Sequence, residues 1–147
     1  MLVPAALAAV VAWEVLWSGR RRAKRSEVYQ MALAHARREG LPLLVVGAPD
    51  RGATRGPGCG DVCIDIQGCA CPVQMRADIT KRLPFRDNSA IVFVSCVLEY
   101  VDDLDAAMAE LQRISGGRLY IVRVEPWTLA AYFYPGARRT LPGEVAQ

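Results

Sequence analysis

The stretch Leu83–Asp103, LPFRDNSAIVFVSCVLEYVDD, carries the clearest structural pattern in this chain of 147 residues. It opens with proline, aspartate, asparagine and serine, which are typical turn residues. The apolar run Ala90–Ser95 then predicts a strand that is covered on both faces. Asp102 or Asp103 is a suitable N-cap for a helix that continues through Ser115. The stretch therefore predicts a turn, a buried strand and the start of a helix.

Similar patterns on either side predict the rest of the domain. The segment Ser26–Glu39 predicts a helix, with Ser26 as N-cap and Gly40 just after its end. Further predicted strands are Leu43–Gly47, Val62–Ile66, Gln74–Asp78 and Arg118–Val124. A strand, a helix and another strand in succession indicate a parallel crossover. We expect an α/β fold with a reduced, Rossmann-like, open and mostly parallel sheet of about five strands.

Composition favours a single globular domain and argues against nucleic acid as a partner. Hydrophobic residues make up 52% of the chain, which excludes a disordered protein. Five of the 18 basic residues lie in the segment 20–25, and Glu14 is the only acid before it. From Ser26 onward this leaves 13 basic and 14 acidic residues. A near-neutral body has no basic surface for a phosphate backbone.

The N-terminal segment Leu2–Trp17 is almost wholly apolar and predicts a single transmembrane helix. Its 16 residues span about 24 Å as a helix, and extension to Gly19 approaches the ~30 Å hydrocarbon core. Basic residues follow the apolar run, which places them on the cytoplasmic side. We therefore expect residues 2–19 to contact membrane lipid, with the domain in the cytoplasm. Within this helix, Glu14 would lie at the membrane interface or pair with a cation on a neighbouring subunit. The alternatives to a membrane anchor are a helix buried in an assembly and a targeting peptide.

The sequence patterns divide the chain into four segments. These are an anchor at 1–19, a basic juxtamembrane segment and helix at 20–40, the α/β domain at 41–125 and a tail at 126–147. The tail holds several aromatic residues close together. They fit a short helix that covers the sheet, or a surface that meets a membrane or a protein partner.

The segment from about Leu43 to Val124 resembles class I S-adenosylmethionine-dependent methyltransferases of small molecules, in a compact or degenerate form. The resemblance rests on LPF-x-D-N-S before the strand Ala90–Ser95 and on Val97-Leu98-Glu99-Tyr100 after it. Gly116-Gly117-Arg118-Leu119 also resembles the turn before the family's fifth strand.

The resemblance implies a binding site for S-adenosylmethionine at the carboxyl ends of the strands. The turn with Gly47 and Gly52 would lie beneath the methionine part of the cofactor. Asp65, at the end of the second strand, would accept the ribose hydroxyls. Asp78 would bind the adenine amine, and Ser95 ends the fourth strand beside them.

Three departures from the family pattern support an alternative function. Pro49 and Arg51 stand where further glycines are usual, loops replace the first two crossover helices, and few residues follow the fifth strand. These features describe a degraded cofactor loop on a shortened fold. The alternative is a non-catalytic membrane-anchored subunit or scaffold of a larger assembly; a weaker third reading is binding of another nucleotide or a protein partner.

The cysteines and the single histidine predict no metal site. Cys59, Cys63, Cys69 and Cys71 lack a CxxC pair, which structural zinc sites usually contain. In a domain that faces the cytosol, these four and Cys96 are expected to be free thiols. His35 has no second histidine to pair with, so we expect it on a helix surface.

Overall fold

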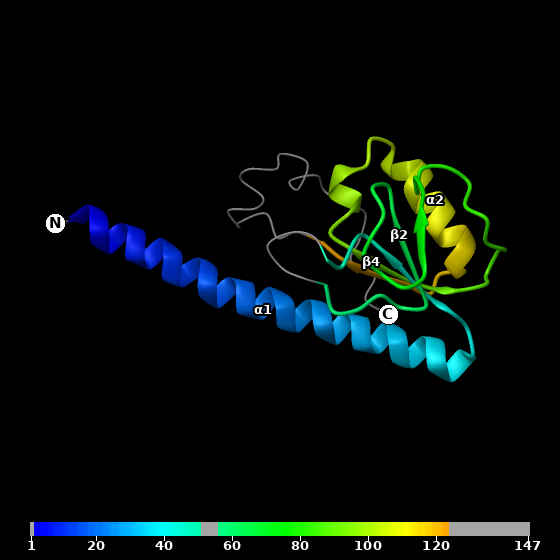
Figure 1. The fold of residues 1–147 in the computed structure, drawn as a ribbon, viewed down its shortest axis with the longest axis horizontal. Helices are drawn as coiled ribbons and strands as arrows, with labels where there is room; N and C mark the ends of the chain where they lie inside the picture. Colours follow the sequence, from blue (N-terminus) through cyan, green and yellow to red (C-terminus); the bar gives the residue numbers. More distant parts are fainter. Residues whose placement is uncertain (1, 51–55, 124–147) are drawn as a thin grey trace.

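Five parallel strands form one sheet in the order β3-β2-β1-β4-β5 (Figure 1). The computed structural model describes residues 2–50 and 56–123, with side chains from residue 6 onward. The elements are α1 (Leu2–Glu39), β1 (Leu43–Val46), β2 (Val62–Asp65), β3 (Gln74–Arg76), β4 (Ile91–Ser95), a 3-10 turn η1 (Leu98–Tyr100), α2 (Leu104–Ser115) and β5 (Leu119–Val122). The predicted five-stranded parallel sheet is confirmed.

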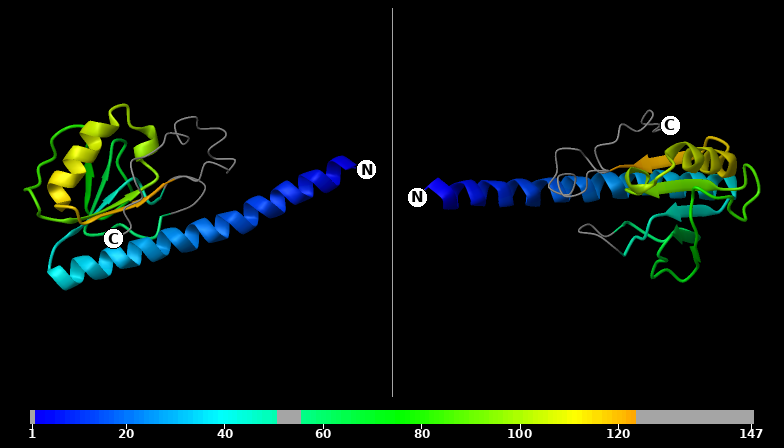
Figure 2. Two further views of the ribbon diagram at one scale, coloured as in Figure 1. Left: turned by 180° about the vertical axis from the view of Figure 1, so that it is seen from behind. Right: turned by 90° about the horizontal axis from the view of Figure 1, so that it is seen from above.

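The sheet lies between two helices, with α1 on one face and α2 on the other (Figure 2). Side chains alternate between the faces along each strand, as the pleat requires. On β1, Leu43 and Val45 pack toward α1, whereas Leu44 and Val46 pack toward α2. All four are at most 1% exposed, which explains the uninterrupted apolar run.

The helix α1 is one continuous element of 38 residues, much longer than predicted. Ser26 lies inside it and is not an N-cap, so the predicted start of a helix at Ser26 is wrong. The helix continues through this region because neither helix-breaking residue interrupts it. Pro4 falls in the first turn, where proline is tolerated, and a single glycine such as Gly19 lowers helix stability by only about 1 kcal/mol relative to alanine. The end was predicted correctly: Gly40 has φ +66°, and the N–H of Leu41 bonds to the carbonyl of Ala36 at 3.0 Å.

The N-terminal part of α1 extends beyond the sheet (Figures 1 and 2). Its large apolar side chains are exposed: Leu7, Val10, Val11, Trp13, Val15 and Leu16. Glu14 forms an ion pair with Arg21 of the same helix at 3.3 Å. From residue 6 onward, no described helix combines the length and apolar character needed to cross a membrane, so the predicted transmembrane span is not supported.

His35 is not a simple surface residue. Its Nδ1 lies 2.8 Å from the hydroxyl of Tyr120 on β5, and its Nε2 lies 2.8 Å from Glu39. Glu39 also pairs with Arg118 at 3.0 Å. The histidine therefore ties the second half of α1 to the edge strand of the sheet.

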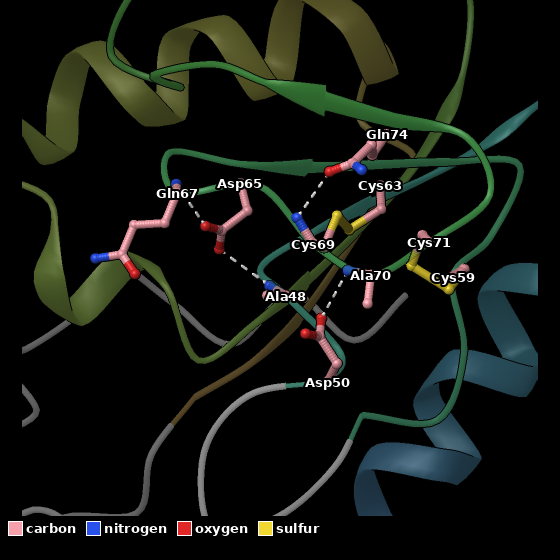
Figure 3. Close-up of a disulfide and its surroundings, with 10 residues drawn as sticks. All are labelled: Ala48, Asp50, Cys59, Cys63, Asp65, Gln67, Cys69, Ala70, Cys71 and Gln74. Atoms are coloured by element: carbon pink, nitrogen blue, oxygen red, sulfur yellow. Dashed lines mark hydrogen bonds between the residues drawn. A yellow bond between two sulfur atoms is a disulfide. The ribbon is translucent and has the colours of Figure 1, made fainter.

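Four of the five cysteines form disulfides, so the prediction of free thiols is wrong for them (Figure 3). Cys59 is bonded to Cys71, and Cys63 to Cys69; Cys96 is free. The spacing did not indicate this pairing because the irregular connection after β2 folds back over the strand that it leaves. That fold brings Cys69 against Cys63 in β2.

Candidate functional site

The candidate site lies at the carboxyl edge of the sheet, where the strand order reverses. The chain moves from β1 to β2 and β3 on one side, then returns to β4 on the other side of β1. Open parallel sheets bind ligands at such a switch point, outside the carboxyl ends of the strands. Here Gly47 follows β1 and Ser95 ends β4, so two of the predicted site residues flank the switch point.

Gly47 is held in a conformation that requires glycine. Its φ is +101°, and its N–H bonds to the carbonyl of Ile64 at 2.9 Å. A Cβ at this position would lie 2.6 Å from Cγ2 of Val97 and 2.8 Å from the carbonyl oxygen of Ser95. The glycine therefore permits the close approach of the β1 and β4 ends.

Asp65 ends β2 and joins the turn after β1 to the turn after β2 (Figure 3). Its Oδ2 accepts the N–H of Ala48 at 3.0 Å, and its Oδ1 accepts the N–H of Gln67 at 2.8 Å. Because Ala48 follows Gly47 directly, the glycine turn and the carboxylate form one hydrogen-bonded unit.

Asp78 lies two residues beyond β3, the strand next to β2. Its Oδ1 accepts both the N–H of Thr80 at 2.9 Å and the hydroxyl of Thr80 at 2.7 Å. The backbone N–H bond from Thr80, followed by the hydroxyl bond, lowers the pKa of Asp78 below its ordinary value. Asp78 thus begins a tight turn and is fixed there as a carboxylate. Gly52 lies outside the described residues.

Arg25 of α1 reaches the same edge, and the sequence did not single it out. Its Nη2 donates a hydrogen bond to the Sγ of Cys96 at 3.0 Å. Burial raises the pKa of the Cys96 thiol, and the nearby Arg25 charge opposes that rise. A signal was present, because Arg25 precedes the buried Tyr29 by four residues and so shares its helix face. This signal is obscured because Arg25 is the last of five basic residues in the segment 20–25.

Other features of the β4 end are unusual. Cys96 has φ +52°, a left-handed conformation that non-glycine residues rarely adopt. Glu99 in η1 is only 1% exposed. A strained residue beside a buried carboxylate marks the turn after β4 as a candidate part of the site.

The LPF-x-D-N-S segment has a structural role that centres on Arg113 of α2. The Arg113 guanidinium donates to the carbonyl of Phe85 at 2.8 Å and to Asp87 at 2.6 Å. It also binds Glu110, which accepts the N–H of Leu83 at 2.7 Å. The conspicuous sequence before β4 therefore holds the β3–β4 connection against α2, away from the glycine turn.

Comparison with known proteins agrees with this architecture. Residues 62–121 match a family model described as "Methyltransferase domain". The match runs from β2 to β5 and leaves out β1 and Gly47. No curated protein and no solved structure matches the chain. Together with the parallel sheet of order β3-β2-β1-β4-β5, the family match supports a class I methyltransferase fold.

Proposed function

We propose that this chain is a methyltransferase-like protein that binds S-adenosylmethionine at the carboxyl edge of its sheet, with a small molecule as methyl acceptor. One observation carries the proposal. Gly47 and Asp65 are joined through Ala48 at the switch point of a parallel sheet, beside the end of β4. The matched methyltransferase domain supports the same assignment.

The residues present fit the nucleoside end of this cofactor. Asp65 is partly exposed at the end of β2, and a carboxylate there suits the two ribose hydroxyls. Asp78 follows the adjacent strand and would face the adenine amine. The backbone at Gly47 would lie near the methionine part of the cofactor, with Ser95 beside it.

When bound, S-adenosylmethionine supplies an activated methyl group on a sulfonium. The contribution of the protein is to hold donor and acceptor in line, which needs few reactive side chains. Gly47 and Asp65 fix the donor through backbone geometry and hydrogen bonds. Glu99 and Cys96 lie in the turn after β4, at the same edge of the sheet.

Isothermal titration of the full chain with S-adenosylmethionine and S-adenosylhomocysteine tests this function. We expect binding by the natural chain and a loss of roughly 10- to 100-fold in affinity for Asp65→Asn. Asp61→Asn is the matched control, because Asp61 pairs with Arg37 and with the N–H of Leu43 at the opposite end of β1. Absence of binding at millimolar ligand would remove the proposal.

A second candidate function is a non-catalytic subunit on the same fold. Two contacts favour it: Val97 and Ser95 approach Gly47 closely, and Arg25 bonds to Cys96. Both contacts join segments at the edge of the sheet where the cofactor would bind. This candidate predicts no cofactor binding and a stable complex through α1. The titration above therefore separates the two functions.

We also propose that the N-terminal part of α1 binds membrane lipid, with the basic segment 20–25 at a cytoplasmic surface. Exposed apolar side chains between Leu7 and Leu16, followed directly by arginines, have the chemistry of an anionic lipid surface. The ring centroids of Trp13 and Trp17 lie 5.4 Å apart, and the Arg20 guanidinium lies over the Trp17 ring. This arrangement suits the headgroup layer of a membrane.

Flotation with phosphatidylcholine vesicles, with and without phosphatidylglycerol, tests lipid binding. We expect tighter binding to the anionic vesicles. The double variant Leu7→Asp, Val11→Asp should lose at least roughly 10-fold in binding, because both exposed side chains would become charged. Met31→Asp, exposed in the second half of α1, is the control. Equal flotation of the double variant and Met31→Asp would contradict lipid binding and favour a protein partner. Absence of flotation by the natural chain would do the same.

A further inference from the structure

Three buried cysteines and the partly buried Cys59 gather into one cluster beside β2 (Figure 3). The Sγ atoms of Cys63, Cys69 and Cys71 all lie within 4.8 Å of one another, and each of these residues is at most 6% exposed. Cys59 joins them through its bond to Cys71. The four sulfurs therefore share one small volume.

This cluster covers a part of the sheet that α1 does not cover. Cys63 pairs in register with Val45, so both side chains lie on the α1 face of the sheet. The helix packs over β1, β4 and β5 on that face. Over β2 the cysteines form a separate core with Ala48. The connection from β2 to β3 contains no helix, so a cross-link takes the place of one.

The backbone of this connection is held by bonds other than the disulfides. The N–H of Cys69 bonds to the side-chain oxygen of Gln74 at 3.0 Å, and the N–H of Ala70 bonds to Asp50 at 3.2 Å. The N–H of Gly68 bonds to the carbonyl of Asp65 at 3.1 Å. The sulfurs of Cys63, Cys69 and Cys71 would therefore stay close together after the disulfides open.

We propose that Cys59, Cys63, Cys69 and Cys71, when reduced, bind one Zn²⁺ as a structural site, and that the two disulfides are the oxidised state of the same cluster. Four thiolates are a standard ligand set for structural zinc. Zn–S bonds of about 2.3 Å in a tetrahedron place sulfurs about 3.8 Å apart. That separation falls within the 4.8 Å that encloses three of the sulfurs.

A dithiol reductant supplies the electrons and protons that convert the disulfide form into the reduced form. Two equivalents of a dithiol reductant supply four electrons and four protons to the two disulfides and become disulfides themselves. Zn²⁺ then displaces the four thiol protons into water and cross-links the same segments. In a thiol-reducing compartment the zinc form would be the stable one.

Metal analysis of the full chain, purified with dithiothreitol and without chelator from zinc-supplemented cells, tests the site. We expect about one Zn²⁺ per chain, falling below ~0.1 in Cys63→Ser. Cys96→Ser is the control and should retain the metal, because Cys96 lies outside the cluster on the β4 end.

Because Cys63→Ser can fail to fold, Co²⁺ provides a second measurement on the unsubstituted chain. Added to the reduced and metal-free full chain, it should give thiolate-to-cobalt charge transfer and the visible bands of tetrahedral coordination. Absence of these bands, less than ~0.1 Zn²⁺ per reduced chain, or two disulfides that persist in dithiothreitol would each overturn the proposal. None of these measurements depends on S-adenosylmethionine.

Discussion

Arg25 donates a hydrogen bond to the Sγ of Cys96 at 3.0 Å, although the two residues are 71 positions apart in the sequence. The contact joins the middle of α1 to the turn after β4. It places a guanidinium at the edge of the sheet where the proposed cofactor site lies. The helix α1 therefore contributes to the candidate site as well as to the core.

This contact predicts the reactivity of Cys96. Without reductant, one thiol per chain should react with iodoacetamide, because the other four cysteines are in disulfides. Burial raises the pKa of Cys96, and Arg25 partly offsets that rise. Arg25→Met should raise the pKa further and slow alkylation at pH 8 by roughly 3- to 10-fold.

The control for this measurement is Arg22→Met, since Arg22 is exposed on α1 less than one turn away. Its alkylation rate should equal that of the natural chain. Faster alkylation in Arg25→Met would mean that Arg25 protects Cys96 by covering it rather than by its charge. Mass spectrometry of the labelled peptide identifies the site.

Gly47→Ala should destabilise the fold by about 2–4 kcal/mol. The new methyl would lie 2.8 Å from the backbone oxygen of Ser95 and 2.6 Å from Val97. Gly117→Ala is the matched control, because Gly117 has φ +90° with nothing within 4 Å of its Cβ position. It should cost only about 1 kcal/mol, from backbone strain alone. Urea unfolding measures both, and equal losses would refute the steric argument.

The strands and α2 could be predicted from the sequence because their signals are local. Ala90 and the β4 residues Ile91–Val94 are buried, as an uninterrupted apolar run predicts, and α2 has clear limits. Asp103 accepts the N–H of Ala106 at 2.9 Å, and Gly116 adopts φ +59° at the other end. Short apolar runs bounded by turn residues specify such elements without tertiary information.

The disulfides and the extent of α1 could not be predicted in this way. Pairing of Cys63 with Cys69 depends on how the irregular connection folds over β2, which no periodicity specifies. In α1, a change of composition near residue 19 suggested a boundary, but helix propensity continues across it. The place of Asp65 at the end of a strand could be predicted from the sequence, whereas its bond to Ala48 could not.

His35 and Tyr120 should be energetically coupled. Their 2.8 Å hydrogen bond links α1 to β5, and Tyr120 is only 7% exposed. A double-mutant cycle with His35→Ala and Tyr120→Phe should give a coupling of about 0.5–1.5 kcal/mol at pH 7. Chemical denaturation of the four proteins measures it. Strictly additive losses would show that the two side chains pack independently.

Glu110 should contribute a pH-dependent part of the stability. Its hydrogen bonds with Arg113, aided by the N–H of Leu83, lower the pKa of Glu110 below its ordinary value of 4.5. A lowered folded-state pKa gives stability that is present above the ordinary pKa and lost as the pH falls through the lowered one. Glu110→Gln should therefore cost about 1–3 kcal/mol at pH 7, and this difference from the natural chain should shrink as the pH falls below about 4.5.

Unfolding by urea at several pH values between about 7 and 3 follows this difference. Asp105→Asn removes one negative charge from the exposed first turn of α2 and serves as the control. Its effect should be a few tenths of a kcal/mol, as expected for a charge near a helix N-terminus. A Glu110→Gln difference that stays constant down to pH 3 would mean that Glu110 acts through shape and neutral hydrogen bonds. The charge pair with Arg113 would then contribute nothing to the link between α2 and the segment before β4.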